Sequence, residues 1–383
     1  MRRAVFWGAA ALIVYAHVGY PLLLWLIARV RRDRRFAAAD RVGDRQPALP
    51  DVSLVIPAYD EDPVIARKVA NSLALDYPRE RLEVIVASDG SSDRTVEQAR
   101  AAGADLVLDL PRGGKIRAQD RAVDRARGEI VAFSDANSTW APDALRRLVA
   151  PFADPRVGYV CGQVRFSGDG ATNQEGAYWR YEMAVRELES RLGGVTAGNG
   201  AIYATRREAY LRVDPRMGHD LSFPFNLVKR GWRALYEPGA RAEEPMVPSI
   251  EGEFRRKRRM MSHTWPIVVR GGMLSPRGYS PLYALEIGSH RVLRYLSPFL
   301  HVTALAANVA LVRRGRVYGA ALALQLGLLA AAAVGAALPP GRAPRPLRLA
   351  HYYVLVTASP AAGLWDWLRS GTPAGWEKAE GTR

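Results

Sequence analysis

The stretch EIVAFSDANS, residues 129–138, carries the strongest indication of the fold. Its residues Ile130–Phe133 are apolar and typical of a short buried strand, and small oxygen-bearing residues follow at once. In a sheet covered by helices, ligands bind at the carboxyl ends of the strands, which is where Asp135 and Asn137 fall. A carboxylate and an amide oxygen placed there suit Mg²⁺ or Mn²⁺ and the diphosphate that such an ion bridges. The alternative is an Asx turn in which Asn137 or Ser138 caps a helix beginning near Pro142-Asp143.

Alternating strand and helix patterns precede this stretch. Residues 52–56, 82–87 and 105–110 predict strands, and residues 63–75 and 95–102 predict helices. The first strand is almost entirely apolar, as expected for an interior strand of a parallel sheet. This βαβαβ order predicts a doubly wound α/β domain with right-handed crossovers.

Acidic and small polar residues end the first two predicted strands. The first strand runs into PAYDE, residues 57–61, and the second into SDGSSD, residues 88–93. An acid after the second strand commonly hydrogen-bonds a base or a ribose in such folds, so Asp89 is a candidate nucleotide ligand. The alternative is a turn in which Ser91 or Ser92 caps the next helix. The sequence has neither a Gly-x-Gly-x-x-Gly motif nor a Walker lysine motif, which argues against dinucleotide oxidoreductases and P-loop enzymes.

Gly113-Gly114-Lys115 follows the third predicted strand and leads into a predicted helix over residues 116–127. Glycines let backbone amides approach an anion closely, and the start of a helix adds partial positive charge. Lys115 would supply a full charge to a diphosphate bound there. The alternative is a solvated lysine on a loop.

The distribution of charge favours a membrane protein. The chain of 383 residues has a formal charge of +16. Much of the positive charge near the N-terminus lies immediately after an apolar run over residues 4–30, which is long enough to span a bilayer. The positive-inside rule then places the N-terminus outside and the next domain in the cytoplasm. A nucleic-acid partner is not expected, because basic residues interleaved with aromatics are not evident in the central region. Three further spans are predicted over residues 292–312, 317–338 and 347–368.

Five segments occur in an order and at a spacing similar to those of one enzyme family: VSLVIPAYDED, VIVASDGSSDRT, GGKIRAQDRAVDRARGEIVAFSDANS, GNGAIYATRREAY and GHDLSFPFNLVKRGWRALYEP. Over residues 52–265 the chain resembles a membrane-anchored family 2 nucleotide-sugar glycosyltransferase of bacterial polysaccharide synthesis. The resemblance implies the GT-A fold, a Rossmann-like, doubly wound mixed sheet, and a divalent metal, Mg²⁺ or Mn²⁺. It implies that the donor is bound by Pro57, Tyr59, Asp60, Glu61, Asp89, Lys115, Asp135 and Asn137, and that Asp135 and Asn137 also hold the metal.

The resemblance also implies an acceptor side and a catalytic base. Gly198-Asn199-Gly200 stands where the family has a loop beside the sugar and the acceptor, although a tight turn before a strand over residues 201–204 is an alternative. Asp220 stands at the position of the catalytic base, and a helix N-cap is the alternative. Two residues depart from the family pattern, since Asn137 replaces a second aspartate and His219 replaces an acid before the base.

A basic run over residues 255–259 replaces the Gln-x-x-Arg-Trp element of processive relatives, so long processive synthesis is not expected. Arg256 and Arg258 are candidate ligands of the diphosphate, and attraction to anionic lipid headgroups is an equal alternative. The only cysteine, Cys161, lies in an apolar run and predicts a buried thiol.

The expected protein is therefore a multi-pass protein of the bacterial cytoplasmic membrane. It would transfer a sugar, with inversion, from a nucleotide-sugar donor to a lipid-linked or glycan acceptor, in contact with membrane lipids. The alternatives are a polyprenyl-phosphate sugar synthase and a non-catalytic scaffold that binds nucleotide-sugar. The predicted organisation is an N-terminal span over residues 1–30, a basic linker over 31–50, the GT-A domain over 51–265, an interfacial segment over 266–291, about three spans over 292–370 and a tail over 371–383.

Overall fold

An eight-stranded mixed sheet lies at the centre of the middle part of the chain. In this computed structural model, which describes residues 1–30, 49–167, 173–245, 249–339 and 342–372, the strand order is β3-β2-β1-β4-β7-β6-β8-β5. The first four strands are parallel, β7 runs antiparallel to both of its neighbours, and β6 and β8 are parallel to each other. The strands are β1 (Val52–Ala58), β2 (Leu82–Asp89), β3 (Leu106–Leu110), β4 (Ile130–Phe133), β5 (Thr139–Trp140), β6 (Val157–Ser167), β7 (Tyr203–Arg206) and β8 (Arg233–Pro245).

Helices cover both faces of this sheet, so its central strands are buried on both sides. Leu54 and Ile56 of β1 belong to a core that includes residues of α3 and α6, while the intervening Val55 belongs to a core with residues of α5 and α8. This double burial is the physical reason for the apolar strands in the sequence. The helices of this part are α3 (Ile65–Leu73), α4 (Thr95–Ala101), α5 (Lys115–Val123), α6 (Ala144–Val149), α7 (Asn173–Leu192) and α8 (His219–Lys229).

The predicted doubly wound α/β fold is confirmed, with small shifts in element bounds. The strand predicted over residues 201–204 begins two residues later, at Tyr203, because the preceding residues belong to the loop described below. The polar residues of the opening stretch do not cap a helix. The short strand β5 follows them, and α6 begins at Ala144 with Asp143 as its N-cap. Cys161 is fully buried, as predicted.

Two described helices are long and apolar enough to cross a membrane, judged by length and composition. One is the 29-residue N-terminal helix Arg2–Val30, formed by α1 (Arg2–Val14), a π-helical turn (Tyr15–Gly19) and α2 (Tyr20–Val30), and the other is the 22-residue α13 (Arg316–Ala337). The predicted basic linker and tail lie almost wholly outside the described residues.

The prediction of about three C-terminal spans is not supported. α12 (Ser297–Val309) has 13 residues, about 20 Å of helix against a hydrocarbon core of about 30 Å. α14 (Arg345–Ser370) is long enough, but its Asp366 forms an ion pair with Arg258 of α9 (Ile250–Val269). The remaining helical segments here are α10 (Pro281–Glu286), a π-helical segment (Ile287–Val292) and α11 (Leu293–Tyr295).

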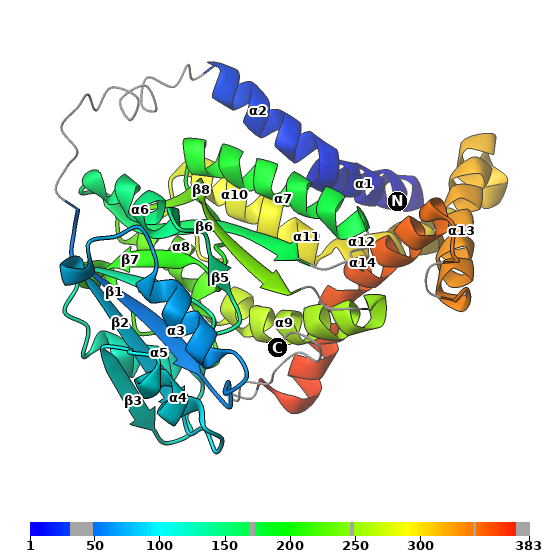
Figure 1. Cartoon of the computed structure of the whole chain (residues 1–383). Helices are drawn as coiled ribbons and strands as arrows, with labels where there is room; N and C mark the ends of the chain where they lie inside the picture. Colours follow the sequence, from blue (N-terminus) through cyan, green and yellow to red (C-terminus); the bar gives the residue numbers. More distant parts are fainter. Residues whose placement is uncertain (31–48, 168–172, 246–248, 340–341, 373–383) are drawn as a thin grey trace.

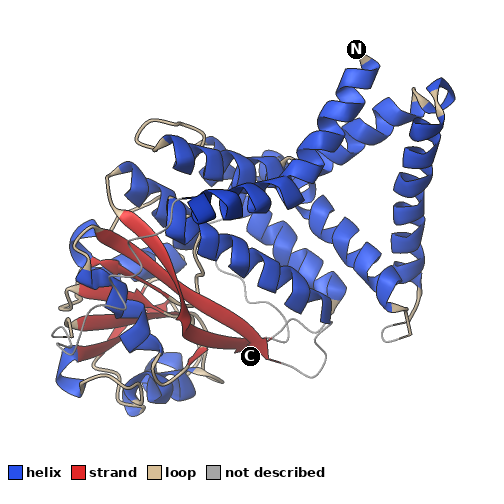
Figure 2. Cartoon of the chain, turned by 90° about the horizontal axis from the view of Figure 1, so that it is seen from above, coloured by secondary structure: helices blue, strands red, loops and turns tan. Residues whose placement is uncertain are grey.

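The N-terminal helix is attached to the sheet-containing part. Figure 1 shows α2 lying along α7, where Leu24 and Val185 are buried in one apolar cluster with Tyr20. Figure 2 shows the strands gathered at one end of the molecule and the N-terminus on the side away from them. The opposite face of α2 exposes Leu22, Trp25 and Leu26, the kind of surface that suits lipid.

Candidate functional site

Asp89 organises the loop before α5. Its carboxylate is almost fully buried, with the residue 1% exposed, and accepts hydrogen bonds from the amides of Gly113 at 2.6 Å and Gly114 at 2.9 Å. The guanidinium of Arg112 donates to the same carboxylate at 3.1 Å. Gly90, at φ +70°, allows this approach, because a Cβ there would lie 2.8 Å from the Arg112 backbone nitrogen. The predicted nucleotide ligand and the predicted phosphate loop are thus one connected unit.

Arg112 joins the ends of the first two strands, and the sequence reading did not identify it. Its guanidinium carbon lies 3.2 Å from the centre of the Tyr59 ring, while its nitrogen binds Asp89. The ring face attracts the cation, and the planar guanidinium can stack on it while its nitrogens donate hydrogen bonds. Arg112 directly precedes the Gly113-Gly114-Lys115 motif, which was the signal available for finding it.

The end of β1 is held against the residues that follow β2. Asp60 takes a left-handed conformation, with φ of +49°, and its Oδ1 accepts from the Ser92 amide at 2.7 Å. Aspartate tolerates this region better than most residues, and such conformations are common at functional sites. Pro57 and Glu61 are buried, and the Glu61 amide donates to the Thr95 hydroxyl at 2.7 Å. The four predicted ligands of this segment therefore surround the same edge of the sheet.

Lys115, Asp135 and Asp220 form the charged centre of the site. Lys115 and Asp135 form an ion pair, each with about a quarter of its side chain exposed. Asp220 is half-buried in the first turn of α8, whose N-cap is Gly218, so the N-cap alternative for Asp220 is wrong. Burial raises the pKa of Asp220, the positive charge of Lys115 opposes this, and the negative charge of Asp135 adds to it. These electrostatic effects place all three charges in one site.

The predicted acceptor loop lies directly beside Asp220. The Gly198 amide donates to the backbone oxygen of Asp220 at 2.6 Å. A Cβ at Gly198 would lie 1.8 Å from the Tyr159 hydroxyl, so no larger residue fits. Asn199 accepts from the Arg186 guanidinium at 2.7 Å and donates to the backbone oxygen of Gly162. The loop is thus held between β6, α7 and α8.

His219, which precedes the predicted base, belongs to the aromatic core. Its Nδ1 lies 2.8 Å from the Tyr203 hydroxyl, and its ring stacks on Phe223 with 4.0 Å between centroids. Burial, reinforced by the positive charge of Lys115, lowers the pKa of His219 to about 3. The side chain is therefore neutral at physiological pH and does not supply the negative charge of the acid that the resemblance implies at this position.

Lys68 is a second residue that the sequence reading missed. It is 2% exposed and lies on the buried face of α3, with its nitrogen 5.2 Å from the centre of the Trp140 ring. Within the described parts of the chain, this nitrogen has no hydrogen-bond partner. Asn71, one turn later, exchanges hydrogen bonds of 2.9 Å with the backbone of Trp140. This face of α3 therefore supports the segment between Asp135 and Trp140. A lysine among the apolar positions of a helix was the available signal.

Replacing Lys68 with methionine is expected to stabilise the protein at pH 6. Burial lowers the pKa of Lys68 to about 7, while Asp135 and Glu244 act in the opposite direction. The unfolded lysine binds a proton up to about pH 10.5, so between pH 7 and 10.5 the unfolded state holds more protons and wild-type stability rises with pH. Below pH 7 the lysine is protonated in both states. The folded protein then bears the full free-energy cost of burying the charged side chain, at most about 5 kcal/mol. The melting temperature of Lys68→Met in EDTA should thus exceed that of wild type at pH 6 by more than at pH 9.5.

The exposed neighbour on the same helix provides the control for this measurement. Arg67→Met should differ from wild type by the same small amount at every pH. A difference between Lys68→Met and wild type that does not change with pH would contradict the assigned burial of the charge.

Asp135 and Asn137 are the residues here that could hold a divalent metal. Among the described residues, no three His, Cys, Asp or Glu side chains come together as a metal site. One carboxylate and one amide oxygen are hard ligands that fit Mg²⁺ or Mn²⁺ when a diphosphate and water complete the coordination. The donor set therefore fits a divalent ion that has further ligands besides the protein.

Arg256 and Arg258 pair with acids outside this group of charges. Arg256 binds Glu253 on its own helix at 2.7 Å and 2.8 Å. Arg258 makes two hydrogen bonds of 2.6 Å with Asp366 and so connects α9 to α14. Their predicted contact with a diphosphate stays a prediction.

Comparison with known proteins decides the family. A model described as "Glycosyltransferase like family 2" matches residues 50–262, more than half of the chain. The chain belongs to glycosyltransferase family 2. It is similar to an N-acetylglucosaminyltransferase of Rhizobium meliloti (strain 1021), with 30% identity over 326 residues, covering 78% of this chain and 75% of the relative.

Two other relatives extend the range of activities. A beta-monoglucosyldiacylglycerol synthase of Trichormus variabilis is 30% identical over 239 residues, covering 56% of this chain and 49% of that protein. A mannosyltransferase of Pyrobaculum calidifontis, solved with GDP-Man and Mn²⁺, superposes with a TM-score of 0.67 at 25% identity, covering 96% of this chain and 99% of that one. This glycosyltransferase thus has the GT-A fold and acts as a hexosyltransferase on nucleotide-sugars, in a family with metal-bound members.

Proposed function

We propose that this glycosyltransferase transfers a sugar, with inversion, from a nucleotide-sugar to a hydroxyl of a lipid-linked or polysaccharide acceptor. The reaction would take place at the cytoplasmic face of the bacterial inner membrane, for exopolysaccharide or cell-envelope synthesis. The observation that carries the proposal is the position of Asp220, a half-buried carboxylate with a raised pKa, next to the Lys115–Asp135 pair and the Gly198 loop.

Asp220 acts as the general base in this proposal. An acceptor hydroxyl is a poor nucleophile, so Asp220 takes its proton as the oxygen attacks the anomeric carbon. The new glycosidic bond forms while the bond from that carbon to the diphosphate breaks, and a single displacement inverts the configuration. The raised pKa makes the carboxylate a stronger base than an exposed aspartate.

The donor is bound on the other side of the charged centre. Asp89 holds the Gly113 and Gly114 amides in place, and together with Arg112 and Lys115 these groups would face the diphosphate. Lys115 would leave Asp135 and neutralise charge on the departing nucleoside diphosphate. A Mg²⁺ or Mn²⁺ ion held by Asp135 and Asn137 would supply further positive charge to that leaving group.

Two observations support membrane association: the two apolar helices, and the similarity to a beta-monoglucosyldiacylglycerol synthase, whose name contains a lipid. Arg256 and Arg258 lie on α9, which connects to the C-terminal helices through Asp366. The proposal includes contact of this basic helix with a diphosphate or with anionic lipid headgroups.

The test uses the full chain in nanodiscs. UDP-GlcNAc, UDP-glucose, GDP-mannose and a dTDP-sugar are supplied with Mg²⁺ or Mn²⁺, and nucleotide release is measured with diacylglycerol, N-acetylglucosamine oligomers or polyprenyl phosphate as acceptor probes. We expect metal-dependent release that one hydroxyl acceptor accelerates, with an inverted product by NMR. Acceleration only by polyprenyl phosphate, insensitive to Asp220→Asn, would indicate a polyprenyl-phosphate sugar synthase. Nucleotide binding without any release would indicate a scaffold.

Replacing Asn137 with aspartate is expected to strengthen metal binding. A second carboxylate adds a full negative charge to the ligand set, and ligand charge tunes affinity by about tenfold or more. The dissociation constant of Mn²⁺, measured by calorimetry with bound nucleoside diphosphate, should decrease in the order Asn137→Ala, wild type, Asn137→Asp. Equal constants in all three proteins would remove Asn137 from the metal site.

A further inference from the structure

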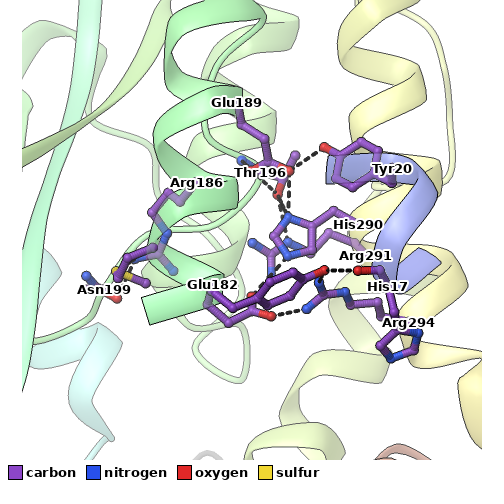
Figure 3. Close-up of polar contacts among 12 residues, drawn as sticks. His17, Tyr20, Glu182, Arg186, Glu189, Thr196, Asn199, His290, Arg291 and Arg294 are labelled. Carbon is purple, nitrogen blue, oxygen red and sulfur yellow. Dashed lines mark hydrogen bonds and ion pairs between the residues drawn. The ribbon is translucent and has the colours of Figure 1, made fainter. Parts of the chain in front are cut away.

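A buried polar network joins the N-terminal helix, α7 and the π-helical segment after α10 (Figure 3). The Tyr20 hydroxyl donates to Glu189 Oε1 at 2.7 Å, and both residues are fully buried. His290 Nδ1 lies 2.6 Å from the same carboxylate oxygen. Tyr20 is 169 positions and His290 is 101 positions from Glu189 in the sequence, and both contact the same carboxylate.

The network continues to the loop beside Asp220. The Thr196 hydroxyl donates to Glu189 Oε2 at 3.0 Å and accepts from Arg291 Nε at 2.8 Å. Two residues later, the Gly198 amide donates to the backbone oxygen of Asp220. A short path of hydrogen bonds and backbone thus leads from Tyr20 through Glu189 and Thr196 to Asp220.

The other end of the same loop is held by α7 as well. Arg186, one turn before Glu189, donates to Asn199, as Figure 3 shows. Glu182, one turn further back, lies 3.1 Å from His290 Nε2 and pairs with Arg294. Polar groups buried together in this way are costly to leave unpaired, so each member restricts the others to one arrangement.

The charge on Glu189 agrees with its place in the network. Burial alone would raise its pKa, but His290, Arg291 and the Tyr20 hydroxyl outweigh burial and hold the pKa of Glu189 below its usual range. Glu189 is therefore ionised at physiological pH, and it requires the donors that surround it.

Attachment of the N-terminal helix does not by itself require these polar contacts. Leu24 packs with Val185 in an apolar cluster, and the Tyr15 hydroxyl, 2.9 Å from the Ser289 hydroxyl, forms a separate polar link to the same C-terminal segment. The hydrogen bond of the Tyr20 hydroxyl differs from these contacts, because its acceptor Glu189 also accepts a hydrogen bond from Thr196 of the loop.

We propose that Tyr20 is a positioning residue for sugar transfer, which acts through Glu189 and Thr196 to hold the Gly198–Asn199 loop against Asp220. The N-terminal helix is then part of the catalytic unit as well as a candidate membrane anchor. The proposal rests on the proposed function, because it takes Asp220 as the base and this loop as the acceptor side.

The first test is hydrogen exchange of the full chain in nanodiscs. Tyr20→Phe removes one hydroxyl and keeps the ring, and Tyr15→Phe is the matched control on the same helix. We expect the peptide over residues 195–200 to exchange at least about fivefold faster in Tyr20→Phe, the effect of one lost hydrogen bond, with β1 and β2 unchanged. Exchange at the wild-type rate, or equal acceleration in Tyr15→Phe, would overturn the proposal.

The second test is turnover of the nucleotide-sugar found active in nanodiscs. We expect a severalfold lower kcat in Tyr20→Phe and Thr196→Val, an unchanged KM for the nucleotide-sugar, and near wild-type turnover in Thr196→Ser and Tyr15→Phe. Faster loop exchange with unchanged kcat would show that transfer does not depend on this link. If wild type shows no turnover, the proposed function fails, and the exchange experiment still decides whether Tyr20 holds the loop.

Discussion

Asp220→Asn is expected to lower kcat by about 100- to 10,000-fold, the usual contribution of a general base. The amide has the shape of the carboxylate but cannot accept the proton of the acceptor hydroxyl. Because Asp89, Arg112 and Lys115 bind the donor in the proposed site, the dissociation constant of the nucleoside diphosphate should stay unchanged. Initial rates of nucleotide release and calorimetric binding measure the two quantities separately.

Asp214→Asn is the control for this substitution. Asp214 lies on the loop before α8 and forms an ion pair with Arg216 at the surface, and such pairs contribute about 0–1 kcal/mol. Its turnover should equal that of wild type. A fully active Asp220→Asn enzyme would mean that another group removes the proton.

The pH dependence of kcat follows from the same carboxylate. Asp220 must be deprotonated to act as a base, so kcat decreases as the pH falls through its pKa. Burial raises this pKa, Asp135 adds to the effect, and Lys115 opposes it, so the acid limb should lie above the value of about 4 that is usual for aspartate.

Asp135→Ala is expected to abolish metal-dependent turnover, with a loss of kcat/KM of at least about 100-fold. The substitution removes the only carboxylate of the proposed metal site and the ion-pair partner of Lys115. Binding of Mn²⁺ in the presence of nucleoside diphosphate should be lost in the same variant, which electron spin resonance detects directly.

Asp143→Ala provides the matched control for Asp135→Ala. Asp143 lies eight positions later in the sequence, exposed at the surface and paired with Arg147. Its turnover and Mn²⁺ binding should both remain normal. Retention of Mn²⁺ binding by Asp135→Ala would assign the metal to other residues and remove Asp135 from the site.

Most of the candidate site was visible in the sequence because it follows the ends of strands. Asp89 and Asp135 stand at the ends of apolar strands, Lys115 follows the loop after the next strand, and parallel strands bring such ends to one edge of a sheet. Lys68, Arg112 and the Tyr20 network were not identified. Their roles depend on which charged groups lie nearby after folding. The periodicity of apolar residues along the sequence does not reveal those neighbours.

The sequence by itself determined the α/β class, the central strands and the polar strand ends of the candidate site, because burial on both faces of a sheet requires apolar strands. It also located the apolar helices Arg2–Val30 and α13. Only the tertiary structure decided that α2 packs on α7 and that Asp366 of α14 forms an ion pair with α9. It alone also showed that Glu189 connects Tyr20 to the loop beside Asp220. An apolar helix face that contacts lipid and one that contacts protein have the same composition. The difference appears only when distant segments meet and their buried polar groups find partners.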